Sequence, residues 1–189
     1  MKLIDAINIG IIAISEGMIV DEQTPNESAG RLKFIIQNEK KILLTRGWWF
    51  NTYNQEIIVP NSGIIKAPYN ALAVYPTNSY DRGIFTVKDE LVYDLMNMTN
   101  RFTAGATYKL KFILDIDFEY LPEHAASYIA YKSALELYAT DLGVDATSQE
   151  FRFKANEAYD LLTIEHTRNL KQGIRQSMSY QRMQQRIYL

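Results

Sequence analysis

The spacing of apolar residues changes twice along this 189-residue chain, and these changes constrain its fold more than any single motif. Before Gly47 and after Pro122, apolar side chains recur every three or four residues, which is the period of an amphipathic helix. Between them, proline and glycine separate short runs with the character of strands. We therefore predict an α+β fold, with a bundle of about four α-helices from the N- and C-terminal parts and a small central antiparallel β-sheet.

The same pattern predicts how the chain is organised. We expect a single domain over residues 1–170, with helices in 1–47 and 122–170 and a β-rich insert over 50–117, followed by a basic C-terminal segment over 171–189. Strands are expected at 55–59, 71–75, 84–87, 91–94 and 107–114, with hairpin turns at 81–83 and 88–90. Cap residues predict that helices begin at Thr24, Pro122 and Thr147.

The first twenty residues, MKLIDAINIGIIAISEGMIV, have some likeness to a signal peptide or a membrane anchor. Asp5, Asn8 and Glu16 interrupt the apolar run. A spanning helix needs about 20 mostly apolar residues, and a signal peptide needs an unbroken apolar core. We therefore expect an amphipathic helix that packs on a core, and no association with a membrane.

Composition excludes several classes of catalyst. There is no cysteine, so disulfide scaffolds, thiolate zinc sites and cysteine nucleophiles are excluded. The two histidines, His124 and His166, lie far apart in the sequence. No glycine-rich phosphate loop and no nucleophile elbow occur. We expect no catalysis and no cofactor.

Charge is distributed unevenly along the chain. After Glu165 there are five basic residues and no acidic one, so this end carries +5 and the remainder −7 of the net charge of −2. A basic end on an acidic body is typical of a segment that binds a partner, although a solvated tail has the same composition. Apolar side chains scattered among Gln and Arg favour a segment that is disordered until it is bound.

Two local clusters have both a chemical and a structural interpretation. Asp115, Asp117 and Glu119 alternate at the end of an expected strand, where three carboxylates on one face would bind a divalent cation in a metal-dependent nuclease or hydrolase. A solvated strand end is the favoured interpretation. Trp48 and Trp49 would offer a stacking platform for bases or sugars, but a core junction is favoured because little positive charge lies nearby.

The order of these motifs resembles a known family. The chain contains an R-G-W-x-F-N run, an acidic stretch after the last strand, an x-P-E start of a long helix, and a short glycine-containing loop before a second charged helix. These are formed by Arg46, Gly47, Trp48, Phe50 and Asn51, by Asp115, Asp117 and Glu119, by Pro122 and Glu123, and by Gly143. Over about residues 1–170, their order and spacing resemble the tail tubular protein A family, the adaptor or gatekeeper rings of short-tailed podovirus-type phages.

The resemblance implies a structural virion protein of the tail or neck, assembled in the host cytoplasm. Such a subunit forms a homo-oligomeric, twelvefold ring between the portal protein and the tail nozzle protein, and DNA passes through without sequence-specific binding. A head-completion connector of a long-tailed phage is the alternative. A ring needs two different patches on each subunit.

Three sets of residues are candidates for these roles. For contact between subunits, we expect the small-residue face and its tyrosines: Ala126, Ala130, Ala134, Tyr131 and Tyr138. For contact with the portal, we expect Arg175, Met178, Tyr180, Arg182, Met183, Arg186 and Tyr188. For the junction between helix and sheet in the core, we expect Arg46, Gly47, Trp48 and Phe50.

Overall fold

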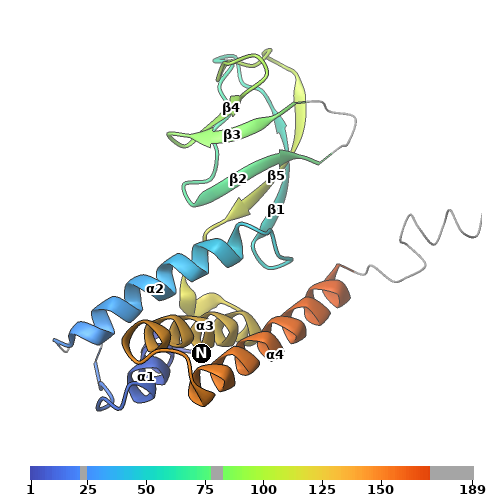
Figure 1. Cartoon of the computed structure of the whole chain (residues 1–189). Helices are drawn as coiled ribbons and strands as arrows, with labels where there is room; N and C mark the ends of the chain where they lie inside the picture. Colours follow the sequence, from blue (N-terminus) through green and yellow to red (C-terminus); the bar gives the residue numbers. More distant parts are fainter. Residues whose placement is uncertain (22–24, 78–82, 171–189) are drawn as a thin grey trace, which may run out of the picture. The chain divides into compact units, whose positions relative to one another are not determined.

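The computed structural model describes residues 1–21, 25–77 and 83–170. These residues form four α-helices, five strands and one short 3-10 helix (Figure 1). The predicted α+β class is confirmed, and each expected strand is present with bounds that differ by at most three residues. In chain order the elements are α1 (Leu3–Ala13), α2 (Glu27–Leu44), β1 (Thr52–Ile58), β2 (Ala71–Pro76), β3 (Phe85–Lys88), β4 (Leu91–Asp94), β5 (Thr107–Leu114), η1 (Phe118–Tyr120), α3 (Glu123–Asp141) and α4 (Ala146–Asn169).

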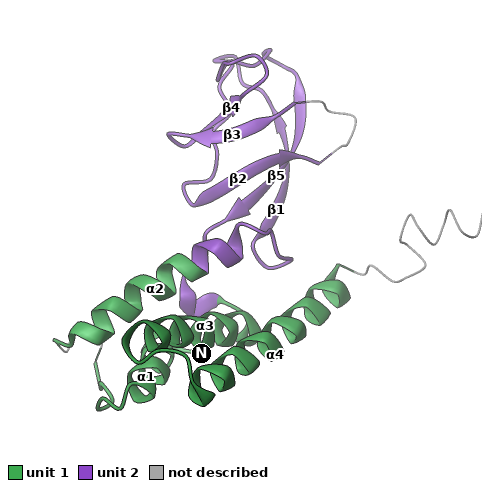
Figure 2. Ribbon diagram, in the orientation of Figure 1, with its two compact units in different colours: residues 1–39, 121–189 green, residues 40–120 purple. Residues whose placement is uncertain are grey.

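The chain divides into two compact units (Figure 2). A helical unit combines residues 1–39 with the part of the chain that begins at residue 121, and a sheet unit contains residues 40–120. The sequence predicted one domain with a β-rich insert over 50–117. The sheet unit is larger than that insert because it includes the last turn of α2 at one end and η1 at the other.

α3 is the central helix of the helical unit, since both α1 and α4 pack against it. Its buried side chains are mostly small, and small side chains let neighbouring helix backbones approach closely. α1 contributes Leu3, Ile7 and Ile11 to this core, and α4 contributes Leu162. α1 is therefore a core helix, and within the described part of the chain no helix is long and apolar enough to cross a membrane.

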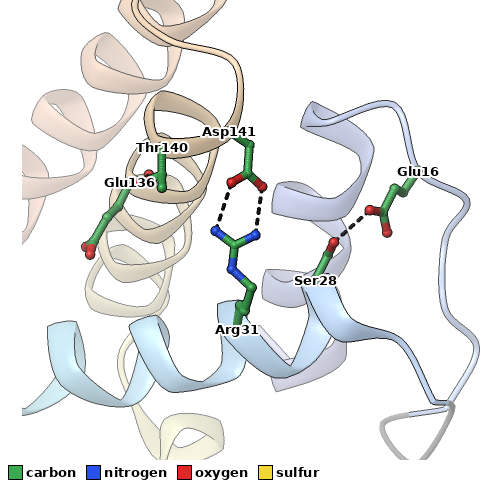
Figure 3. A network of polar contacts seen from close by, with 6 residues as sticks. All are labelled: Glu16, Ser28, Arg31, Glu136, Thr140 and Asp141. Carbon is green, nitrogen blue, oxygen red and sulfur yellow. Dashed lines mark hydrogen bonds and ion pairs between the residues drawn. The ribbon is translucent and has the colours of Figure 1, made fainter.

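Polar contacts hold the segment between α1 and α2 in place. The buried side-chain amide of Asn8 donates to the carbonyl of Ile19 (3.0 Å) and accepts from its N–H (2.9 Å). Ser28 donates to Glu16 (2.6 Å) (Figure 3). This hydrogen bond and one from Asn26 hold the pKa of Glu16 below its usual value.

The cap of α2 lies two residues after the Thr24 that the sequence indicates. The side chain of Asn26 accepts from the N–H of Ala29 (2.8 Å) and so caps the helix, whereas Thr24 lies outside the described residues. Further along, the guanidinium of Arg31 makes a two-bond contact with the carboxylate of Asp141 at the end of α3 (3.1 and 2.8 Å) (Figure 3). This contact joins α2 to α3 within the helical unit.

The sheet unit contains two small antiparallel sheets rather than the one expected. One has the order β1-β5-β2 and the other is the β3-β4 hairpin. Both hairpin turn residues, Asp89 and Glu90, have positive φ (50° and 59°), so the predicted turn at 88–90 is confirmed. The other expected turn, at 81–83, falls largely outside the described residues. The core cluster is formed by Val59, Ile65, Val74, Val92, Phe102, Leu110 and Phe112.

The predicted cap of α4, Thr147, is wrong by two residues, because the helix begins at Ala146 and its cap is Asp145. The Asp145 carboxylate accepts from the N–H of Ser148 (3.0 Å), and the Ser148 hydroxyl accepts from the N–H of Asp145 (3.0 Å). The hydroxyl of Tyr138 also donates to Asp145 (2.6 Å). The bonds from Tyr138 and from the Ser148 backbone lower the pKa of Asp145.

We expect Asp145→Ala to lower the Tm at pH 7 by about 2–4 °C, because it removes the cap and the acceptor for Tyr138. A lowered folded-state pKa means that this contribution is complete above the unfolded-state pKa and disappears as the pH falls through the folded-state value. The Tm difference from wild type should therefore shrink below about pH 4. Asp145→Asn, which retains a capping oxygen, is the matched control with a smaller loss. Thermal denaturation followed by circular dichroism measures both, and a difference that does not change with pH would contradict the assignment.

Candidate functional site

The R-G-W-x-F-N run forms a hydrogen-bonded junction between the end of α2 and the end of β5. The Asn51 side chain accepts from the N–H of Trp48 (2.7 Å) and donates to the carbonyls of Leu44 (2.9 Å) and Leu114 (3.0 Å). The indole N–H of Trp48 donates to the carbonyl of Leu43 (2.8 Å), and Trp48 is only 4% exposed. Every polar atom of the Asn51 amide is therefore used inside the sheet unit.

Gly47 and its neighbours explain why the run has this composition. Gly47 has φ +74°, and a Cβ there would lie 2.9 Å from Cδ1 of Ile113, so only glycine is free of strain. Trp49 and Phe50 are half-buried and pack edge to face with ring centroids 4.9 Å apart, while Arg46 is exposed. A buried Trp48 with its N–H already bonded offers no stacking surface for a base or a sugar.

An open cleft of about 580 Å³ lies in the sheet unit beside this junction. Tyr69 and Tyr120, which are 85% and 79% exposed, line it together with polar groups from three segments. The remaining lining residues are Lys41, Asn70, Ala71, Leu72, Asp115, Ile116 and Asp117. The cleft therefore combines exposed aromatic surface with charges of both signs.

The three carboxylates of the expected strand end do not form a cation site. β5 ends at Leu114, so Asp115 and Asp117 follow the strand and Glu119 lies in η1 instead of on one strand face. Asp115 pairs with the ammonium of Lys40 at 2.8 Å, and the Lys40 side chain is only 5% exposed. Among the described residues, no group of three acidic or histidine side chains is arranged to hold a metal ion. The metal-dependent nuclease or hydrolase interpretation therefore has no geometric support here.

The small-residue face lies inside the helical unit. Ala126, Ala130 and Ala134 have no exposed surface, because α1 and α4 pack around α3. They do not reach a neighbouring subunit while the helical unit keeps this structure, which corrects the expectation for these three residues. Tyr138 is also buried, with its hydroxyl bonded to Asp145. Tyr131 is half-buried, with the ammonium of Lys154 5.7 Å from its ring centroid.

The remaining candidates are on separate elements or outside the described residues. His124 lies in the first turn of α3 and His166 in the last turn of α4. The residues expected to contact the portal all fall after residue 170 and lie outside the described part of the chain: Arg175, Met178, Tyr180, Arg182, Met183, Arg186 and Tyr188.

The sequence contains no indication of the roles of two residues that make buried polar contacts here: Asn51 was named only as part of the R-G-W-x-F-N run, and Lys40 was not singled out. Asn51 is the last residue of the R-G-W-x-F-N run, and the sequence does not indicate that its side chain is only 1% exposed. Lys40 is one of two adjacent lysines near the end of α2, and nothing in the sequence indicates which of them is buried. Tyr69 follows Pro68 in a loop and carries no pattern of its own.

Comparison with known proteins covers both units of the chain. A family model described as Tail tubular protein matches residues 4–176. Tail tubular protein A of Klebsiella phage KP34 is 37% identical to this chain over 169 residues, which is 89% of this chain and 89% of that relative. The likeness therefore concerns the whole architecture rather than one unit.

We expect Asn51→Ala to lower the free energy of unfolding by about 3 kcal/mol, because a buried polar group that loses its partner costs about 1–3 kcal/mol. Asn54→Ala, at an exposed position of the same strand, is the matched control and should change stability by less than about 0.5 kcal/mol. Urea denaturation measures both. Equal effects of the two substitutions would show that the Asn51 amide does not hold the junction.

We expect Asp115→Ala to lower the free energy of unfolding by about 3 kcal/mol, because it leaves the buried ammonium of Lys40 without its partner. Adding Lys40→Met should recover much of that loss, and Glu119→Ala at an exposed position is the control.

The Tm of the wild type should not respond to Mg²⁺ or to a chelator. A Tm increase with Mg²⁺ that disappears in Asp115→Ala would instead establish a cation site.

Proposed function

Because this chain belongs to the tail tubular protein family, we propose that it is the subunit of a head-to-tail adaptor ring that links the portal protein to the tail nozzle protein. Membership of the family makes it a structural protein of the phage tail and a component of the virion. The observation that carries the finer proposal is a likeness to a Tail tubular protein A that extends across both units. We propose no catalytic role and no cofactor.

A ring subunit acts through surfaces rather than through reacting groups. A ring that closes by rotation requires two different patches on each subunit, each complementary to the other. We propose a twelvefold ring, assembled in the host cytoplasm and located in the tail or neck of the virion. In such a ring the junction at Asn51 has a structural role, since it holds the end of α2 on the sheet unit.

The charge distribution supports a role as a DNA conduit. Residues 1–39 and 121–170 of the helical unit carry a net charge of −7, whereas residues 40–120 carry +1. Duplex DNA is a dense line of negative charge, so an acidic wall does not retain it. We propose that the helical unit faces the DNA and that the basic residues of 171–189 contact an acidic surface of the portal.

We expect negative-stain electron microscopy of the full chain, incubated with the portal of its own phage, to show an annular density beneath the portal. The portal alone and the protein alone are the controls. A chain that ends at residue 170 should give weaker occupancy of this density, because it lacks the basic segment.

Two outcomes would contradict these proposals separately. If the mixture shows no added density, the adaptor ring proposal is wrong. If the shortened chain occupies the portal as well as the full chain does, the ring proposal stands and the role of residues 171–189 is wrong.

A further inference from the structure

Two helices carry exposed side chains at identical spacing. On α2 these are Phe34, Asn38, Lys41 and Ile42, and on α4 they are Phe153, Glu157, Asp160 and Leu161. All eight are exposed. Residues four, seven and eight places apart share one side of a helix. We name these two sets the α2 stripe and the α4 stripe, and each lies on one continuous helix (Figure 1).

The aromatic residues make these stripes unusual for a solvent-exposed surface. Phe34 is 68% exposed and Phe153 is 69% exposed, although phenylalanine is among the side chains that gain most from burial. Each is followed eight positions later by an exposed aliphatic side chain, Ile42 or Leu161. An aromatic and an aliphatic side chain two turns apart provide apolar contacts for a facing helix.

The two stripes differ in charge. The α2 stripe presents the ammonium of Lys41, and the α4 stripe presents the carboxylate of Asp160 at the equivalent position. The α4 stripe also carries Glu157 where the α2 stripe carries the neutral Asn38. The nearest basic side chain on α4, Lys154, pairs with Glu150 at 2.6 Å. Stripes with the same spacing of apolar residues and opposite charges are complementary to each other when the helices are aligned in parallel and in register.

We propose that the α2 stripe of one subunit packs in parallel against the α4 stripe of the next copy of this chain. Phe34 then lies beside Phe153, Ile42 beside Leu161, and Lys41 beside Asp160. The inference rests on the proposed ring and names its two patches. Parallel pairing of either stripe with its own copy would place like charges opposite each other, which disfavours a parallel symmetric dimer, whereas the α2 stripe against the α4 stripe is the head-to-tail contact that a ring needs.

Engineered cysteines provide a direct test, because the natural chain has none. In a chain carrying Asn38→Cys and Glu157→Cys, the two thiols meet across the proposed contact. Assembled on the portal and oxidised, this chain should form a ladder of disulfide-linked oligomers on a non-reducing gel. The matched control pairs Glu157→Cys with Asn54→Cys, an exposed position on β1, and should give no ladder.

Charge reversal provides an independent test. Lys41→Glu and Asp160→Lys should each weaken assembly on the portal by about tenfold or more, since like charges across a contact oppose association. The double variant restores the attraction with reversed signs and should recover assembly. Circular dichroism checks that each exposed substitution leaves the fold intact.

The outcomes separate this inference from the ring proposal. Rings beneath the portal without a ladder, and without an effect of charge reversal, would overturn the stripe pairing and leave the ring proposal standing. Charge reversals that weaken portal binding without any ladder between subunits would assign the stripes to the portal and overturn the pairing. Absence of rings for the wild-type chain would overturn both.

Discussion

Two adjacent buried charges on α2, Glu39 and Lys40, determine how this helix is held. Glu39 pairs with Lys132 on α3 at 2.7 Å within the helical unit, and Lys40 pairs with Asp115 after β5 at 2.8 Å within the sheet unit. Burial by itself would lower the pKa of Lys132, but the hydrogen bond and charge of Glu39 raise it. Rotation of α2 about its own axis would break both pairs. Such a rotation would be costly, because it would leave buried charges without their partners. Together with the buried side chains of Leu32, Ile36, Leu43 and Leu44, these two contacts fix the orientation of α2 in each unit.

This constraint also determines which surface of α2 remains available. With Glu39 and Lys40 directed to their partners, Phe34 and Lys41 lie on the solvent-exposed side of the helix. On α3, in contrast, the small side chains are buried within the helical unit, where they let α1 and α4 approach. A small-residue face on a helix therefore indicates close packing but does not distinguish packing within a subunit from packing between subunits.

The strands were predictable from short β-rich runs separated by proline and glycine, and in β5 also from alternation of apolar and polar residues. In β5, Leu110 and Phe112 are buried while Lys109 is exposed, and proline or glycine bounds most of the runs. Helix starts were less predictable, because several residues with capping side chains are neighbours. Asp145, Thr147 and Ser148 all carry an oxygen that can cap, and only the reciprocal bonds between Asp145 and Ser148 select the first of them. The interpretation of the three carboxylates as a cation site also could not be tested from local sequence, because Asp115 pairs with Lys40, 75 residues earlier in the chain.

The sequence by itself determined the α+β class, the order of the elements, the hairpin at 88–90 and the resemblance to the tail tubular family, because each depends on local periodicity, turn chemistry or motif order. Tertiary structure alone decided which polar and small side chains are buried. The Asn51 amide, the Lys40 ammonium and the alanines of α3 acquire their roles from groups distant in the chain. Burial depends on what packs against a residue, and the spacing of apolar residues does not contain that information.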